Sequence, residues 1–328
     1  MKVAVFGVGR MGLLHAKLLR EMPEIDTLLV TDLDPQRARA VRREVDAEVV
    51  ANPIIALERA DAAAIATPPD THAELAKAAV DRRRPDLCEK PLAADLRGAI
   101  DVADYVQSTG VPVQVGLQRR FDPAYAAARA LVASGSLGRL HLMRLHGTEP
   151  TTPRSHRTTL FRNTAIHDFD LIRWLSGTEV ESVYVEGSDR EQGPFDRGLD
   201  PDTIVVTVRL CDGSLGSVTI TRLSPHGYDV RAKLVGSLDH IVVGGPNAPR
   251  SGCWNRTPQS SQTPGGLGRR GSRRHIAANW RHFWLQLAVS PAWPSLSATA
   301  WSLSESPRLC TGRSSRAARS CWRDRRWH

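Results

Sequence analysis

Lys2-Val3-Ala4-Val5-Phe6-Gly7-Val8-Gly9-Arg10-Met11-Gly12 is the stretch that decides the fold of the first part of this chain. The apolar run at 2–6 predicts a buried strand, and apolar residues that recur at helical spacing after the glycines predict a helix. The glycines follow the pattern GxGxxG. Gly7 permits a tight turn, Gly9 lets a phosphate group approach the backbone, and Gly12 lets the helix pack closely on the strand.

An acidic residue at a suitable distance makes this turn specific for a dinucleotide. Asp32 lies 20 residues after Gly12, at the end of a second predicted strand, where its carboxylate can accept hydrogen bonds from an adenosine ribose. The start of the helix offers N–H groups and a positive dipole end to the pyrophosphate. The predicted cofactor-binding residues here are Gly7, Gly9, Arg10, Met11, Gly12 and Asp32.

The charge of Asp32 also predicts which dinucleotide binds. A carboxylate repels the 2′-phosphate of NADP, so NAD is the expected cofactor and is favoured over NADP. Arg37 and Arg39 lie nearby in the sequence and would weaken this preference if they faced the ribose; the alternative is a solvated helix face. Asp34 and Pro35 predict the N-cap and first residue of that helix.

The pattern of elements divides the chain before residue 250 into two domains. Strands and helices alternate with short connections over 1–119, which predicts an α/β domain with a Rossmann doubly wound parallel sheet. A helix at 123–133 is then followed by runs of alternating hydrophobicity, which predict a C-terminal α+β domain at 120–249 with a mostly antiparallel sheet and one open face. These runs are Leu140–Leu145, Val180–Val185, Thr203–Leu210, Ser214–Thr221 and Val230–Val235.

Residues 250–328 form an atypical basic tail. This segment holds 14 arginines, no lysine and two acidic residues, a net charge of +12. The whole chain carries +9, so residues 1–249 carry −3 and the globular part is slightly acidic. Seven of the eight tryptophans also lie in the tail. We find no persistent helical or strand periodicity in its last 60 or so residues.

Two interpretations of the tail stay open. Arginine without lysine, together with Trp, Ser, Pro and Cys, is typical of GC-rich coding DNA translated out of frame, which places a loss of the reading frame near residues 246–252. The alternative is a genuine basic tail that binds an anionic partner such as nucleic acid. Because the globular part is acidic, we do not expect it to bind nucleic acid.

Composition limits the remaining classes. Met1 leads directly into the first strand, and no apolar run of about 18 residues occurs, so we expect a cytoplasmic protein with no membrane span. The cysteines form no CxxC pair and no metal-binding spacing, and we predict free thiols. The five cysteines are Cys88, Cys211, Cys253, Cys310 and Cys321.

Two segments carry candidate catalytic chemistry. Glu89-Lys90-Pro91 follows a predicted strand, at the sheet edge where ligands bind in such folds, and a lysine there can stabilise a developing alkoxide. Residues 163–175 read as a helix on which four polar or aromatic residues, spaced 4, 3 and 4, share one face. They are Asn163, His167, Asp170 and Trp174. The alternative for Lys90 is an ordinary surface lysine, and the alternative for the helix face is a structural network whose hydrogen bonds are satisfied within the protein. A metal site is disfavoured because the sequence shows no third ligand.

The order of motifs resembles the Gfo/Idh/MocA oxidoreductase family over residues 1 to about 245, and within it the inositol 2-dehydrogenases. The resemblance implies NAD-linked oxidation of a ring hydroxyl of a cyclitol or sugar to a ketone. It also implies a homo-tetramer built through the second domain. The matching pieces are GVGRMG at 7–12, LCEKPLA at 87–93, VQVGLQRRFDPAY at 113–125, NTAIHDFDLIRWL at 163–175 and HGYDVRAKLVG at 226–236.

The resemblance also implies roles for individual residues. Lys90 would lie between nicotinamide and substrate, with Glu89 as a cofactor neighbour, and His167 would be the catalytic base. The implied substrate-binding residues are Arg120, Thr164, Asp170 and Tyr228.

Asn163 departs from the family's pattern, which has aspartate four residues before the histidine. A neutral amide does not stabilise the imidazolium that forms, so activity would be low unless Asp170 supplies the charge. A catalytically impaired NAD-binding protein is therefore the alternative function.

Overall fold

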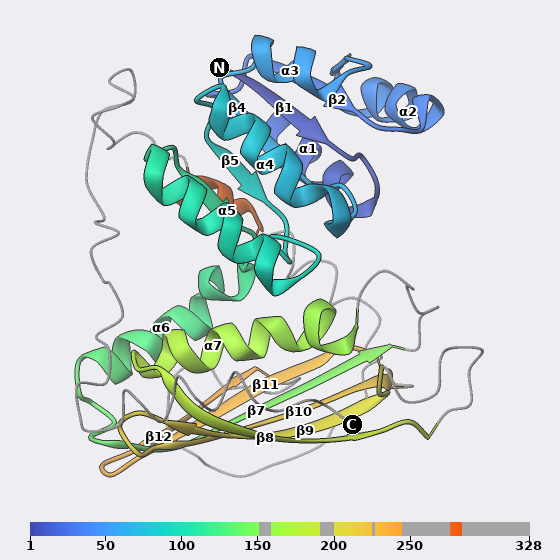
Figure 1. The fold of residues 1–328 in the computed structure, drawn as a ribbon. Helices are drawn as coiled ribbons and strands as arrows, with labels where there is room; N and C mark the ends of the chain where they lie inside the picture. The colour runs from blue at the N-terminus through green and yellow to red at the C-terminus, as the bar shows by residue number, and fades with distance from the viewer. Residues whose placement is uncertain (151–158, 191–199, 225–226, 245–275, 284–328) are drawn as a thin grey trace, which may run out of the picture. The chain divides into compact units, whose positions relative to one another are not determined.

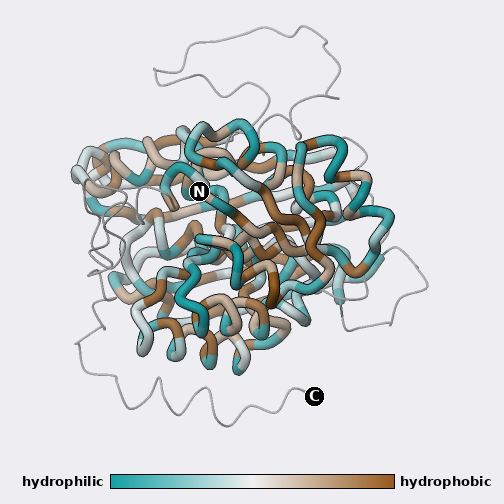
Figure 2. Tube along the Cα trace, turned by 90° about the horizontal axis from the view of Figure 1, so that it is seen from above, coloured by the Kyte–Doolittle hydropathy of each residue, from teal (hydrophilic) through white to brown (hydrophobic). Residues whose placement is uncertain are grey.

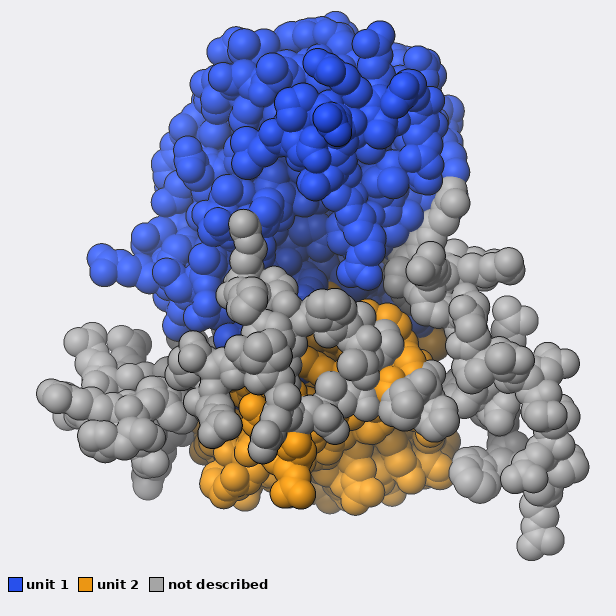
Figure 3. Space-filling view, turned by 90° about the vertical axis from the view of Figure 1, so that its right-hand side faces the viewer, with its two compact units in different colours: residues 1–122, 155–163, 266–301 blue, residues 123–154, 164–265, 302–328 orange. Residues whose placement is uncertain are grey.

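The computed structural model describes residues 1–150, 159–190, 200–224, 227–244 and 276–283 (Figure 1). These residues group into two compact units, which are coloured separately in Figure 3. The first unit contains residues 1–122, 159–163 and 276–283 of the described part, and the second contains the other described residues.

The first unit is built on a six-stranded, all-parallel sheet with the order β3-β2-β1-β4-β5-β6. This is the order of dinucleotide-binding α/β folds, and it confirms the predicted Rossmann domain. The strands are β1 (Lys2–Phe6), β2 (Thr27–Thr31), β3 (Glu48–Val49), β4 (Ala62–Ile65), β5 (Asp86–Cys88) and β6 (Val113–Val115). The helices are α1 (Arg10–Arg20), α2 (Pro35–Val45), α3 (Pro53–Arg59), α4 (His72–Asp81) and α5 (Leu96–Thr109).

Each face of this sheet has its own apolar core. Val3 and Val5 of β1 belong to a cluster with α1 and α2, whereas Ala4 and Phe6 belong to a cluster with α3, α4 and α5. Because side chains alternate along a strand, a strand that is buried on both faces must be apolar throughout, as residues 3–6 are. Figure 2 shows brown, hydrophobic stretches of the chain in the middle of the view.

A helix from the predicted tail completes the α1 and α2 face. Residues 276–283 are helical, and Ile276, Trp280 and Phe283 belong to the same apolar cluster as Val3 and Val5. Although no apolar period persists through the tail, these eight residues form a helix. Gln114 of β6 donates to the backbone carbonyl of Asn279 over 3.4 Å, which ties the helix to the edge of the sheet.

Asp86 at the start of β5 is a buried carboxyl group whose two oxygens have no hydrogen-bond partner among the described residues. Burial raises the pKa of Asp86 well above its ordinary value. The unfolded chain releases this proton near the ordinary pKa, whereas the folded chain keeps it. The contribution of Asp86 to stability is therefore greatest below the unfolded pKa and is lost as pH rises towards the folded pKa.

Asp86→Asn is expected to remove this pH dependence, because the amide is neutral at every pH. Urea unfolding at a series of pH values should show the unaltered chain losing up to about 1.4 kcal/mol per pH unit above about pH 4. The variant should lack that slope and be the more stable protein at neutral pH. Equal slopes in the two proteins would mean that Asp86 is ionised in the fold.

The second unit is built on a six-stranded sheet with the order β12-β11-β7-β10-β9-β8. Only β7 and β10 pair in parallel, so the predicted mostly antiparallel sheet is confirmed. The strands are β7 (Leu140–Pro150), β8 (Val180–Ser188), β9 (Thr203–Leu210), β10 (Leu215–Ser224), β11 (Asp229–Gly236) and β12 (His240–Gly244). Sequence analysis did not identify β12.

Helices α6 (Pro123–Ala133) and α7 (Ile166–Ser176) pack on one face of this sheet, and α7 contacts β7 and β10. Strand β9 shows the resulting alternation: Ile204, Val206 and Val208 are buried, whereas the residues between them are exposed. The other face is open and carries the exposed apolar side chains of Val205 and Val242.

The structure also bears on the predicted free thiols and on the predicted absence of a membrane span. The prediction of free thiols holds for the buried Cys88 but is wrong for Cys211, which is disulfide-bonded. None of the helices in the described part of the chain is long and apolar enough to cross a membrane.

Candidate functional site

The glycine turn between β1 and α1 has the geometry of a phosphate cradle. Gly7 has a φ of +75°, which side-chain-bearing residues rarely adopt. A Cβ on Gly12 would overlap the carbonyl oxygen of Gly7, so the helix can pass this closely only with glycine. Nothing lies within 4 Å of a Cβ placed on Gly9, and no side chain caps the helix. Open space in front of uncapped N–H groups, which include those of Arg10 and Met11, fits a pyrophosphate.

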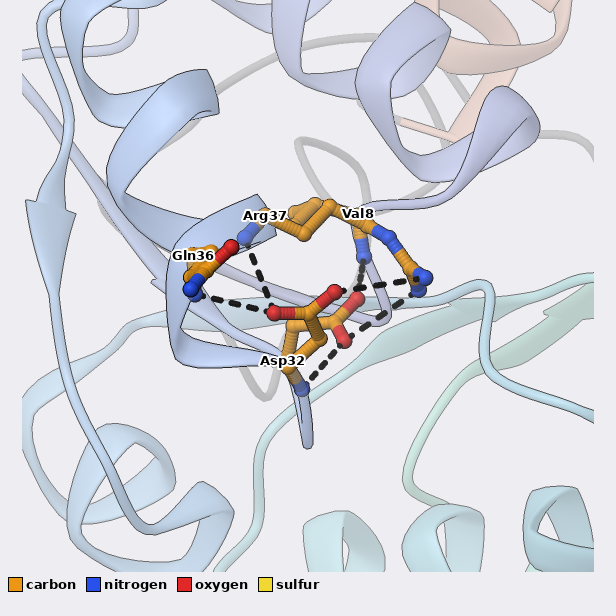
Figure 4. A network of polar contacts seen from close by, with 5 residues as sticks. Val8, Asp32, Gln36 and Arg37 are labelled. Atoms are coloured by element: carbon orange, nitrogen blue, oxygen red, sulfur yellow. Dashed lines mark hydrogen bonds and ion pairs between the residues drawn. The ribbon is translucent and has the colours of Figure 1, made fainter.

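Asp32 ties this turn to the end of β2 (Figure 4). Its carboxylate accepts the backbone N–H of Val8 over 2.8 Å and that of Asp34 over 2.9 Å, and Arg37 Nη1 lies at 3.4 Å. A carboxylate has about four acceptor positions, so one more remains for a ribose hydroxyl. Asp34 caps α2 through Gln36 and Arg37, which confirms the predicted cap.

Glu89, predicted as a cofactor neighbour, has a buried carboxylate held by His15. His15 Nε2 lies 2.9 Å from Glu89 Oε1, and the indole of Trp280 donates to His15 Nδ1 over 2.9 Å. Burial raises the pKa of Glu89, but the hydrogen-bonding and charge interactions with His15, followed by those with Lys90, lower it more, so the pKa lies below its ordinary value. No pattern in the sequence predicted the contact between His15 and Trp280.

Lys90 is oriented by the helical segment that starts the candidate catalytic helix. Its Nζ donates to the Asn163 backbone carbonyl over 2.6 Å and to Asn163 Oδ1 over 3.1 Å. Both residues belong to the first unit. Asn163 therefore contacts the predicted catalytic lysine through its backbone carbonyl and its neutral side-chain amide.

The other predicted residues of this helix lie in the second unit. Thr164, His167 and Asp168 are buried, and Asp170 is half-buried. The hydroxyl of Thr164 has no hydrogen-bond partner among the described residues. A buried hydroxyl of this kind is one that a polar ligand can satisfy.

The predicted polar face with spacings of 4, 3 and 4 assumed α-helical geometry throughout, and this is wrong for Asn163. Residues Phe161–Ala165 form a π-helical turn before α7 begins at Ile166. The wider turn shifts Asn163 from the alignment expected along an α-helix. Asn163 is exposed, whereas Asp168, which sequence analysis did not single out, is buried.

The two weaker candidates lie in different units. Arg120 is half-buried in a 3-10 turn at Gln118–Phe121 of the first unit. Tyr228 is exposed in the second unit, directly after Gly227, whose φ is +87°. In the part of the chain that the structure describes, no group of three or more His, Cys, Asp and Glu residues could hold a metal ion.

The sheet order, the open glycine turn and the Asp32 carboxylate at the end of β2 define an NAD-binding Rossmann oxidoreductase. Residues 1–117 match the family model described as "Oxidoreductase family, NAD-binding Rossmann fold", and residues 125–242 match "GFO/IDH/MocA C-terminal domain". The chain belongs to the Gfo/Idh/MocA oxidoreductase family, which confirms the resemblance found in the sequence.

Several relatives are named as inositol dehydrogenases. The chain is 36% identical over 260 residues to the myo-inositol dehydrogenase Hyg17 of Streptomyces leeuwenhoekii, which covers 77% of this chain and 80% of that protein. It is 33% identical to a scyllo-inositol 2-dehydrogenase (NAD(+)) of Bacillus subtilis, over 74% of each chain. A solved myo-inositol dehydrogenase of Corynebacterium glutamicum is 27% identical with a TM-score of 0.75, covering 86% of this chain and 87% of that one.

Proposed function

We propose that this protein oxidises a ring hydroxyl of a cyclitol or sugar, of the myo-inositol type, to a ketone with NAD as acceptor. The observation that carries the proposal is the buried polar group of Thr164, His167 and Asp168 at the start of α7. The unsatisfied hydroxyl of Thr164 suits a substrate rich in hydroxyl groups. The similarity to inositol dehydrogenases supports the choice of substrate.

Each candidate residue would have its own role in the reaction. His167 accepts the proton of the substrate hydroxyl as a general base. Lys90, held by Asn163, donates a hydrogen bond to the same oxygen and stabilises its developing negative charge. When bound, NAD supplies the acceptor for the hydride that leaves the carbon with its bonding electrons. Thr164 and Asp170 orient the other hydroxyls, with Arg120 and Tyr228 as further candidates.

The test is an absorbance assay of NADH formation with a panel of cyclitols and sugars. Formation of NADH with myo-inositol or a stereoisomer, and not with acyclic alcohols, would support the proposal. Binding of NAD without turnover of any polyol would favour the alternative, a catalytically impaired NAD-binding protein.

We also propose that Asp32 makes the enzyme prefer NAD over NADP. Its carboxylate would repel a 2′-phosphate, and it holds Arg37, which is half exposed. Asp32→Asn keeps the acceptor for Val8 but removes the charge and releases Arg37. The ratio of kcat/KM for NADP to that for NAD should rise about 10- to 100-fold, the range for gaining a hydrogen bond to a charged group.

Asp34→Asn is the matched control for this change. It removes a carboxylate from the same turn, also beside Arg37, but keeps the oxygen that caps α2. Its cofactor ratio should stay close to that of the unaltered chain. An equal rise in both variants would mean that general charge near the ribose, and not Asp32, sets the preference.

The open face of the second unit supports a proposed homo-tetramer. Val205 on β9 and Leu215 on β10 are exposed apolar side chains on neighbouring strands of this sheet. Two copies of such a face would bury each other's apolar side chains. They include Val205, Leu215 and Val242.

A further inference from the structure

Three buried side chains connect helix 276–283 to the residue before Lys90. Trp280 donates to His15, and His15 meets Glu89, each over 2.9 Å. Trp280 is 0% exposed, His15 1% and Glu89 8%. The contacts join residues 265 and 74 positions apart, so the fold alone brings the three together.

The donor and acceptor types of the three groups determine where the protons lie. An indole N–H is only a donor, so His15 Nδ1 accepts and carries no hydrogen. A histidine with one bare ring nitrogen is neutral, and its hydrogen then lies on Nε2. A carboxylate is only an acceptor, so Nε2–H donates to Glu89. The pair of His15 and Glu89 therefore carries a single negative charge.

Glu89 is also enclosed on a second side. A Cβ on Gly116 would come within 3.2–3.3 Å of the carboxylate atoms of Glu89, so the strand end leaves just enough room for that group. The backbone N–H of Glu89 donates to the Ile65 carbonyl over 2.8 Å. With its side chain and backbone both held, Glu89 offers a fixed negative charge one residue before Lys90, and the two charges interact.

We propose that Trp280 is a positioning residue that keeps His15 neutral and thereby keeps the charge of Glu89 available to Lys90. This inference rests on the role of Lys90 in the proposed function. Without the indole N–H, His15 Nδ1 is open to a proton, and a neighbouring carboxylate favours the imidazolium form. An imidazolium would neutralise Glu89 and reduce the electrostatic support for the Lys90 ammonium.

Proton positions on His15 test the first half of the proposal without any substrate. Long-range 1H–15N NMR of the full chain at neutral pH should show Nε2 protonated and Nδ1 bare, and in Trp280→Phe both nitrogens protonated. The signals that disappear in His15→Gln identify this residue. A protonated Nδ1 in the unaltered chain, or identical His15 signals in Trp280→Phe, would overturn the inference.

Measurements of turnover test the second half of the proposal, which is that the charge of Glu89 supports Lys90. Trp280→Phe should lower kcat about tenfold, on the scale of one hydrogen bond to a charged group, while the Kd for NAD changes less than about twofold. Phe283→Leu alters packing in the same helix but keeps the indole N–H, so it should preserve both kcat and the His15 signals.

The effect of Trp280→Phe can also be measured in a chain that already carries His15→Gln. Its amide donates to Glu89 and takes up no further proton, so adding Trp280→Phe should cause no additional loss of kcat. An unchanged kcat in Trp280→Phe, or an equal loss in Phe283→Leu, would overturn the positioning role. An unaltered chain that turns over no polyol would refute the proposed function instead, and the NMR spectra would still decide the proton positions.

Discussion

Replacing His167 by alanine is expected to lower polyol oxidation by about 10²–10⁴-fold, the usual contribution of a general base. His167 is buried at the start of α7, three residues after the buried Thr164. The glycine turn and Asp32 lie in the other unit and are untouched by the change. Calorimetric titration should therefore give nearly the same Kd for NAD in the variant and the unaltered chain.

His240→Ala is the matched control for His167→Ala. His240 is exposed on β12 of the same unit, beside Asp239, and has no proposed role. This variant should retain full turnover. If His167→Ala retained turnover as well, the base would have to be another group, and the role carried over from the family would be wrong for this chain.

The first unit shows what local sequence signals can predict. The Rossmann fold could be predicted because its signals are local in the sequence and each has a clear physical reason. These signals are the apolar run at 2–6, the glycine turn and Asp32. Strand β3 has two residues, too few to show a pattern. Helix α3 begins with Asn52 as its cap and Pro53 as its first residue, the same signal that located α2, and the sequence analysis overlooked it.

The candidate site was less predictable because its contacts join distant segments. Lys90 and His167 were found by their place in motifs, but the contact of Lys90 with Asn163 depends on a π-helical turn that α-helical periodicity does not reveal. The contact of Trp280 with His15 joins the tail to the first helix, and no local pattern reports a pairing over 265 residues.

The tail shows that a short helix can be missed when only sequence periodicity is used to find it. Its composition is atypical over 250–328, yet Ile276, Trp280 and Phe283 are buried at helical spacing within eight residues. A short helix of this kind is too brief to stand out against a non-periodic background. Its apolar side cannot be recognised as a core face until the sheet that it covers is known.

Phe283→Ala is expected to destabilise the protein by about 3–5 kcal/mol, the usual cost of removing a fully buried phenylalanine. Phe283 is 0% exposed, and its ring lies 5.5 Å from that of Trp280 in an edge-to-face arrangement. Both pack in the cluster that includes Val3 and Val5, so the cavity would open beside the central strand. Urea unfolding followed by circular dichroism would measure the loss.

Arg281→Ala in the same helix is the control, because Arg281 is exposed and surface changes usually stay within about 0.5 kcal/mol. The comparison also tests whether this part of the tail packs on the sheet. A helix that completes the sheet's core makes Phe283 costly to remove, whatever the origin of residues 250–328. Equal stability of both variants and the unaltered chain would mean that this helix does not pack on the sheet in solution, as expected of a segment translated out of frame.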